Sequence, residues 1–155
     1  GSYSCVHGRR YSRMRNAIAI TLTAFVISGC SFLNSLNPMY FNMARFDNNE
    51  YMLAVEVRTQ ANLGARKCGT PEVNAEVSKL WEDTLMLKNY SESIPNNEET
   101  VTMTSELLEI VRGLDKRYNI DLKKTSMAYC TNKFGNIEKN ATIITNVVGN
   151  KPHKQ

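Results

Sequence analysis

The chain carries the stretch Cys68-Gly69-Thr70-Pro71-Glu72, which decides the fold that we expect. Just before this stretch, apolar residues recur at steps of three and four, the spacing of an amphipathic helix. A glycine is typical of the position that follows a helix. Threonine, proline and glutamate in succession are typical of an N-cap and a first helical turn, so a second helix should start at once. A turn this short makes the two helices antiparallel neighbours.

Outward from this turn, the helical spacing recurs along the chain. We expect helices over about 47–67, 71–90, 97–118 and 126–148, and no run of alternating residues predicts a strand there. The sequence therefore predicts an all-α fold, a four-helix up-down-up-down antiparallel bundle over 47–149. Its predicted core positions are Ala54, Val57, Ala61, Ala65, Cys68, Val73, Val77, Leu80, Thr84, Leu87, Met103, Leu107, Ile110, Leu114, Tyr118, Met127, Cys130, Phe134, Ile137, Ala141, Ile144 and Val148.

Two of the expected helices begin with a capping-box pattern. In this pattern a cap residue and an acid three places later each bind the other's backbone N–H. The two pairs are Asp47 with Glu50, and Asn96 with Glu99. We expect both pairs to close the first turn of their helices.

A short apolar run near the N-terminus ends in Ile27-Ser28-Gly29-Cys30. The run covers 12 residues, 17–28, and a methionine and an arginine precede it. It is shorter than the roughly 20 apolar residues that a membrane span needs, and its layout is that of a secretory signal. We interpret 14–29 as a signal peptide and 1–13 as an upstream or non-native segment.

This tetrapeptide resembles the lipobox of bacterial lipoproteins: an aliphatic residue, two small residues and a cysteine. The resemblance implies that Cys30 receives a diacylglyceryl thioether, because its thiolate is the nucleophile, and that the signal peptide is removed. Several acyl chains make such an anchor durable. Ser31 in the next position implies sorting to the outer membrane, facing the periplasm. An uncleaved signal anchor and ordinary signal cleavage are the alternatives.

The segment 30–46 should tether the domain, yet it is rich in large apolar residues, unlike a flexible linker. One interpretation is a helical prelude from Asn37-Pro38 that packs back on the bundle. The other is a surface for a partner or a membrane, for which the candidate contacts are Phe32, Tyr40, Phe41 and Phe46. At the other terminus, 150–155 is expected to be a basic, unstructured tail.

Cys68 and Cys130 are the cysteines left in the expected domain. Cys68 ends the first helix, and in an up-down-up-down bundle the adjacent fourth helix starts at that same end. Cys130 lies about one turn into the fourth helix. Exported proteins meet oxidising conditions, so we expect a Cys68–Cys130 disulfide; two buried, reduced thiols are the alternative.

The distribution of charge argues against nucleic acid as a partner. The net charge is +4, from 19 Lys+Arg and 15 Asp+Glu. Four arginines precede Cys30 and no acid does, so 15 cations and 15 acids remain from there onward. That part lacks the basic surplus that binds phosphates.

The residues of the expected domain offer little for catalysis. After Cys30 the sequence has one histidine, His153, in the expected tail, so the usual general base and metal ligand are missing. We therefore expect no catalytic, cofactor-binding or metal-binding residues and no cofactor. The methionines near the helical stripes are expected in the core rather than as ligands: Met52, Met86, Met103 and Met127.

The expected domain also resembles the pilotins, lipid-anchored helical proteins that escort secretion-channel subunits. The matching features are Cys68 at the end of the first helix, the tight turn with Pro71, and Cys130-x-x-x-Phe134 in the last helix. The resemblance implies a non-catalytic binding or chaperone module that clamps an amphipathic helix of an envelope protein. Two alternatives remain: a phage- or plasmid-encoded envelope lipoprotein in superinfection exclusion or lysis, and a structural envelope lipoprotein.

Overall fold

The computed structural model describes residues 43–153. Cys30 and its signal peptide, and the candidate contacts Phe32, Tyr40 and Phe41, lie outside the described residues. Within them the chain forms four α-helices and a short π-helix, with no strand. The elements are α3 (Asn48–Ala65), α4 (Val73–Ser93), α5 (Glu98–Asp115), η2 (Lys116–Ile120) and α6 (Met127–Gly149). The predicted all-α four-helix bundle is confirmed.

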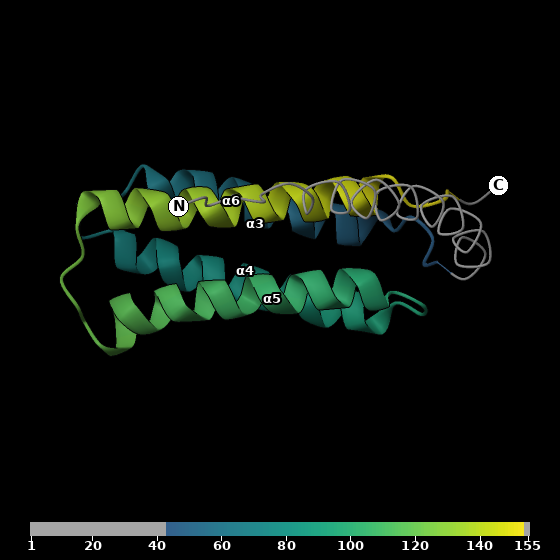
Figure 1. Cartoon of the computed structure of the whole chain (residues 1–155), viewed down its shortest axis with the longest axis horizontal. Helices are drawn as coiled ribbons and strands as arrows, with labels where there is room; N and C mark the ends of the chain where they lie inside the picture. The colour runs from purple at the N-terminus through teal and green to yellow at the C-terminus, as the bar shows by residue number, and fades with distance from the viewer. Residues whose placement is uncertain (1–42, 154–155) are drawn as a thin grey trace, which may run out of the picture. The chain divides into compact units, whose positions relative to one another are not determined.

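The helices pack in the predicted up-down-up-down order. Each of α3, α4 and α5 lies beside the helix that follows it, and α6 closes the bundle by packing along α3 (Figure 1). One end of the bundle therefore holds the start of α3 and the end of α6. The opposite end holds the 66–72 turn and the 116–126 connection. None of the helices in this part of the chain is long and apolar enough to cross a membrane.

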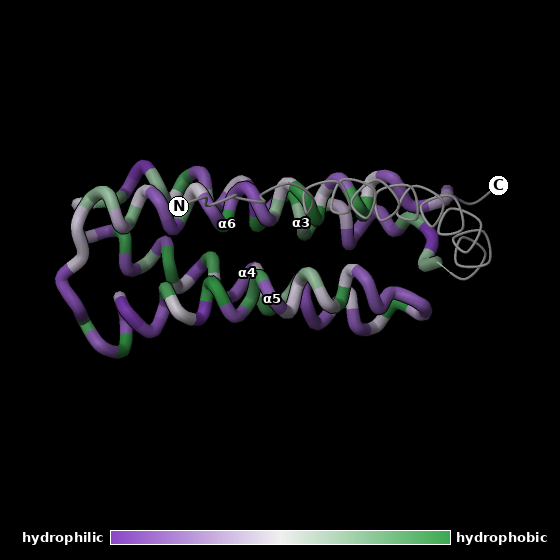
Figure 2. Tube along the Cα trace, in the orientation of Figure 1, coloured by the Kyte–Doolittle hydropathy of each residue, from purple (hydrophilic) through white to green (hydrophobic). Residues whose placement is uncertain are grey.

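The core follows the predicted stripes closely, and apolar and polar residues alternate along each helix (Figure 2). On α5, however, Val111 is fully buried and Ile110 is 37% exposed, so the prediction of Ile110 as a core residue is wrong. The inward row runs through Thr104, Leu107, Val111 and Leu114. Ile110 lies one position, about 100°, away from that row and faces out.

The predicted burial of the methionines is wrong for three of the four. Met52, Met86 and Met127 are 54%, 56% and 60% exposed, and Met103 packs partly buried against the core. Met127 is the first residue of α6 and lies at the end of the bundle, where few residues cover it. Met52 and Met86 lie beside, not on, the inward rows of α3 and α4, so they emerge at the surface.

Helix ends differ from the predicted capping patterns. Asp47 caps α3 as expected, accepting bonds from the backbone N–H of Asn49 and Glu50. The Glu50 carboxylate is buried in another network, so the first capping box is not formed.

The start of α4 also differs from the prediction. The hydroxyl of Thr70 donates to the carbonyl of Lys67, so this side chain belongs to the preceding turn and does not cap α4. The second helix accordingly begins at 73, slightly later than predicted.

The second predicted capping box is also wrong. The N-cap of α5 is Asn97 rather than Asn96. Asn96 adopts a left-handed backbone with φ of 59°, which closes the turn before α5. The side chain of Asn97 turns inward and binds Glu50 and the carbonyl of Ser91 instead of capping its own helix.

Candidate functional site

The described part of the chain has a concave surface along α3 and α4, which we call the α3–α4 groove. It consists of two depressions open to solvent, with volumes of about 390 Å³ and 550 Å³. The first is lined mainly by α3 and by Lys79 of α4, and the second by α4 alone. The residues that line them are Met52, Leu53, Val55, Glu56, Thr59, Gln60, Leu63, Lys79, Glu82, Leu85, Met86, Asn89, Tyr90 and Ser93.

Cross-helix contacts fix the register of the groove. At one end the Tyr90 hydroxyl donates to the Asp47 carboxylate at 3.1 Å. Further along, Lys79 Nζ lies 3.7 Å from a carboxylate oxygen of Glu56. Met52 is about one turn before Glu56, and Met86 is about one turn before Tyr90. Because the two helices are antiparallel, the two exposed methionines lie between these contacts, within about one helical turn of the same level.

The charged residues in and next to the groove are one lysine and three acids, so the groove is mildly acidic. Lys79 Nζ donates to both carboxylate oxygens of Asp83, at 2.9 and 3.1 Å. This hydrogen bond raises the pKa of Lys79 above its usual range, against the opposing effect of desolvation; the charge of Asp83 and then of Glu56 adds to the rise. Lys79 and Asp83 thus neutralise each other, and Glu56 and Glu82 leave a mildly acidic rim.

The predicted disulfide pair is found at the end of the bundle away from Asp47. The sulfur atoms of Cys68 and Cys130 lie 2.00 Å apart, and the bridge joins positions 62 residues apart. It ties the end of α3 to the start of α6, as the topology predicts. Both cysteines are buried.

The described part of the C-terminal segment, 150–153, is not the free tail that was predicted. Lys151 is 3% exposed and its Nζ donates to Glu50 at 2.6 Å and to Asn97 at 2.5 Å. Asn97 in turn donates to Glu50 at 2.6 Å, so the three side chains form a closed network. Local sequence spacing does not predict this network, because its contacts join positions that are 47 to 101 residues apart.

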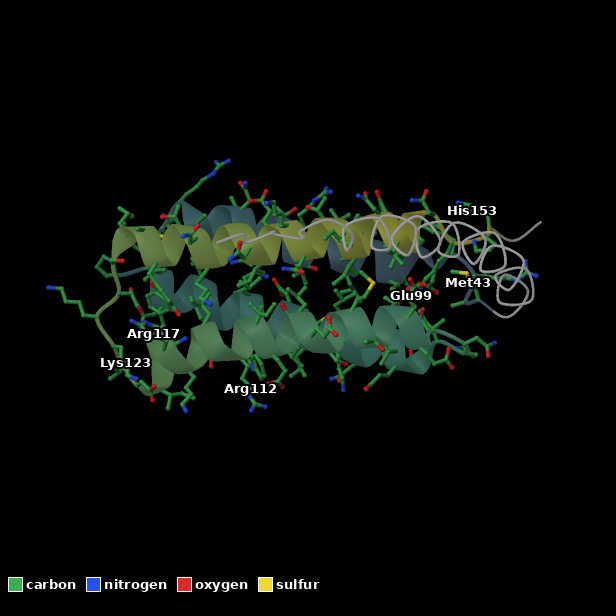
Figure 3. All side chains as sticks on the ribbon, in the orientation of Figure 1. Met43, Glu99, Arg112, Arg117, Lys123 and His153 are labelled. Carbon is green, nitrogen blue, oxygen red and sulfur yellow. A yellow bond between two sulfur atoms is a disulfide. The ribbon has the colours of Figure 1, made fainter. Side chains whose placement is uncertain are left out.

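Phe46 packs on the domain itself. Its ring lies 4.5 Å from that of His153 and 5.9 Å from that of Tyr51, and its backbone N–H donates to the carbonyl of Pro152. Met43 and His153 lie at this same end of the bundle (Figure 3). The last residues of the predicted tether, 43–46, thus pack on the domain without regular secondary structure, and Asn37-Pro38 lies outside the described residues.

Within residues 43–153, no group of three or more His, Cys, Asp or Glu is placed to hold a metal ion. The residues that the sequence did not single out for binding are Met52 and Met86. Their position at the surface could have been predicted, because neither methionine falls on the three-and-four spacing of the buried residues in its own helix. Comparisons with protein-family models, curated proteins and solved structures find no match to this chain.

Proposed function

We propose that this chain is a lipid-anchored, non-catalytic binding module on the periplasmic side of a bacterial envelope, similar in role to the pilotins. The proposal has two parts. The lipobox at Ile27-Ser28-Gly29-Cys30 supports attachment to the outer membrane. The α3–α4 groove supports binding of a partner there, through an amphipathic helix that belongs to an envelope protein.

The observation that carries the second part is the pair of exposed methionines at nearly the same level, Met52 and Met86. Methionine is unbranched and polarizable, so it adapts to apolar side chains of different shapes. Leu63, which is 45% exposed, lies about three turns after Met52 on α3 and extends the apolar surface of the groove. A partner helix with apolar residues at three- and four-residue steps fits such an apolar surface, and its basic residues would contact Glu56 and Glu82.

The groove is tested by photocrosslinking in cells, with a light-activated residue placed at 52, at 86 or at 139. Lys139 is exposed on α6 and serves as the control position. We expect one and the same envelope protein to be captured from 52 and from 86, and not from 139. Met52→Ser should weaken capture from 86, since the two positions share one partner. Capture of lipid or peptidoglycan alone, or equal capture from 139, would overturn the proposal.

The anchor is tested by mass spectrometry of the N-terminal peptide of the mature chain. We expect Cys30 to be its first residue and to carry a diacylglyceryl group. Cys30→Ser should leave the chain unlipidated and remove it from the outer-membrane fraction. A mature chain that begins elsewhere, or an unmodified Cys30, would contradict the anchor while leaving the groove to its own test.

A further inference from the structure

The connection between α5 and α6 carries a second surface, at the end of the bundle that holds the disulfide. Arg117 and Lys123 mark this end in Figure 3. The backbone of the connection is held in place: Asp121 N–H donates to the Lys116 carbonyl at 2.7 Å, and Lys123 N–H donates to the Arg117 carbonyl at 3.0 Å. Buried Tyr118 accepts a hydrogen bond from Thr125, which anchors the loop to the core.

This fixed loop presents large aliphatic side chains to solvent. Ile120 is 68% exposed and Leu122 is 74% exposed. Leu122 has a backbone φ of 49°, in the left-handed region that a leucine rarely adopts. Met127, 60% exposed, is the first residue of α6 and so lies at the same end of the bundle. A strained residue held outward by an ordered loop is typical of a contact site rather than of a passive connection.

The aliphatic residues lie in a segment with an excess of positive charge, in which Asp121 pairs with Lys123 at 3.4 Å. Residues 116–124 contain four cations and one acid, a net charge of +3. Three of these cations are exposed lysines: Lys116, Lys123 and Lys124. Arg117 lies with its guanidinium 4.3 Å from the centre of the Tyr129 ring. We call the set formed by Lys116, Ile120, Leu122, Lys123 and Lys124 the basic tip.

We propose that the basic tip binds an anionic membrane surface. Aliphatic side chains that enter the headgroup region, with lysines around them that reach phosphates, are the combination that such a surface attracts. A protein partner fits less well, because lysine is depleted at protein interfaces and the tip lacks the exposed aromatic residues that dominate them. The inference is independent of the α3–α4 groove and of lipidation at Cys30.

The test uses the full chain with Cys30→Ser, so that no acyl chain contributes to binding. Co-sedimentation is measured with vesicles of phosphatidylcholine alone and of phosphatidylcholine mixed with phosphatidylglycerol. We expect binding to the mixed vesicles, weakening as salt rises. Lys123→Gln with Lys124→Gln should weaken it by about 30-fold, which corresponds to about 1 kcal/mol for each lysine. Ile120→Ser with Leu122→Ser should reduce it as well, even at low salt.

The matched control is Lys139→Gln with Ile143→Ser, which removes the same two kinds of side chain from an exposed part of α6. It should leave binding unchanged. Circular dichroism and the intact disulfide verify that each variant is folded. Equal binding to both kinds of vesicle, no binding to either, or an equal loss in the control would overturn the proposal. So would photocrosslinking from 122 in cells that captures a protein and no lipid.

Discussion

Glu50 and Lys151 form a buried ion pair that joins the first turn of α3 to the chain beyond α6. The Nζ and carboxylate atoms are 2.6 Å apart, although the residues are 101 positions apart in the sequence. Asn97 bonds to both partners, so the start of α5 is held at the same point. This network fastens the bundle at one end, and the Cys68–Cys130 disulfide fastens the other.

Lys151→Ala is therefore expected to destabilise the domain strongly. The substitution leaves the Glu50 carboxylate buried without its charge partner, and breaking a buried pair in this way costs about 3–5 kcal/mol. Urea unfolding measures the free energy. Glu50→Gln with Lys151→Met should cost less than Lys151→Ala alone, since no buried charge remains. Lys139→Ala on the exposed face of α6 is the control, and a similar loss there would contradict the role of the pair.

A glycine in α3 makes the close packing of α3 on α6 possible. A Cβ at Gly64 would lie 2.2 Å from Cε1 of Phe134, which is fully buried. Gly64→Ala should cost about 1–3 kcal/mol, the range for overpacking a core. Gly135 is helical with open space around its Cβ position, so Gly135→Ala should stabilise by up to about 1 kcal/mol. In thermal unfolding, we expect Gly64→Ala to lower the melting temperature and Gly135→Ala to raise it. No change for Gly64→Ala would show that the Phe134 ring moves aside freely.

Reduction of the Cys68–Cys130 disulfide should lower the stability of the domain without any amino-acid substitution. The bridge spans 62 positions, for which loop-closure entropy gives about 4 kcal/mol. The measurement is urea unfolding with and without reductant, on a chain carrying Cys5→Ser and Cys30→Ser so that no other thiol reacts. Intact-mass analysis after alkylation counts the free thiols. Two free thiols in the untreated protein, or unchanged stability on reduction, would contradict the expected outcome.

The sequence predicts those features that depend on local spacing. The antiparallel order of the helices follows from the turn at Cys68 to Glu72, and that order places Cys130 beside Cys68. The buried face of α6 is also predicted from local spacing, because steps of three and four place one set of residues on the same side of the helix. This set includes Cys130, Phe134 and Ile137.

Features built from contacts between distant residues were not predicted. Lys151 reads as a charged tail residue, and only the meeting of three segments gives it a buried partner. Ile110 and Val111 are adjacent and equally apolar, so spacing alone places either one inward. The groove depends on Met52 and Met86 reaching nearly the same level on two helices, which requires the register between them.

The pKa of Lys79 is raised chiefly by the hydrogen bond of this lysine to Asp83. Asp83→Asn should bring that pKa back toward the ordinary value of about 10.4. Glu56→Gln should have a smaller effect, because Glu56 lies farther away, at 3.7 Å. NMR titration of the Lys79 Cε signal measures both. An equal shift in the two variants would contradict the assignment of Asp83 as the main partner.

A raised pKa also fixes how the Lys79 contribution to stability depends on pH. The folded chain holds the proton more tightly than the unfolded chain, so the contribution is complete below about pH 10.4 and is lost as pH rises through the folded pKa. The Lys79 side chain is 51% exposed, which limits the contribution to under about 1 kcal/mol. The stability difference between the wild type and Lys79→Met should thus stay constant from neutral pH to the onset of lysine titration, and shrink above it. A difference that instead grew with rising pH would show that Lys79 is stabilised in its neutral form, contrary to its bond with Asp83.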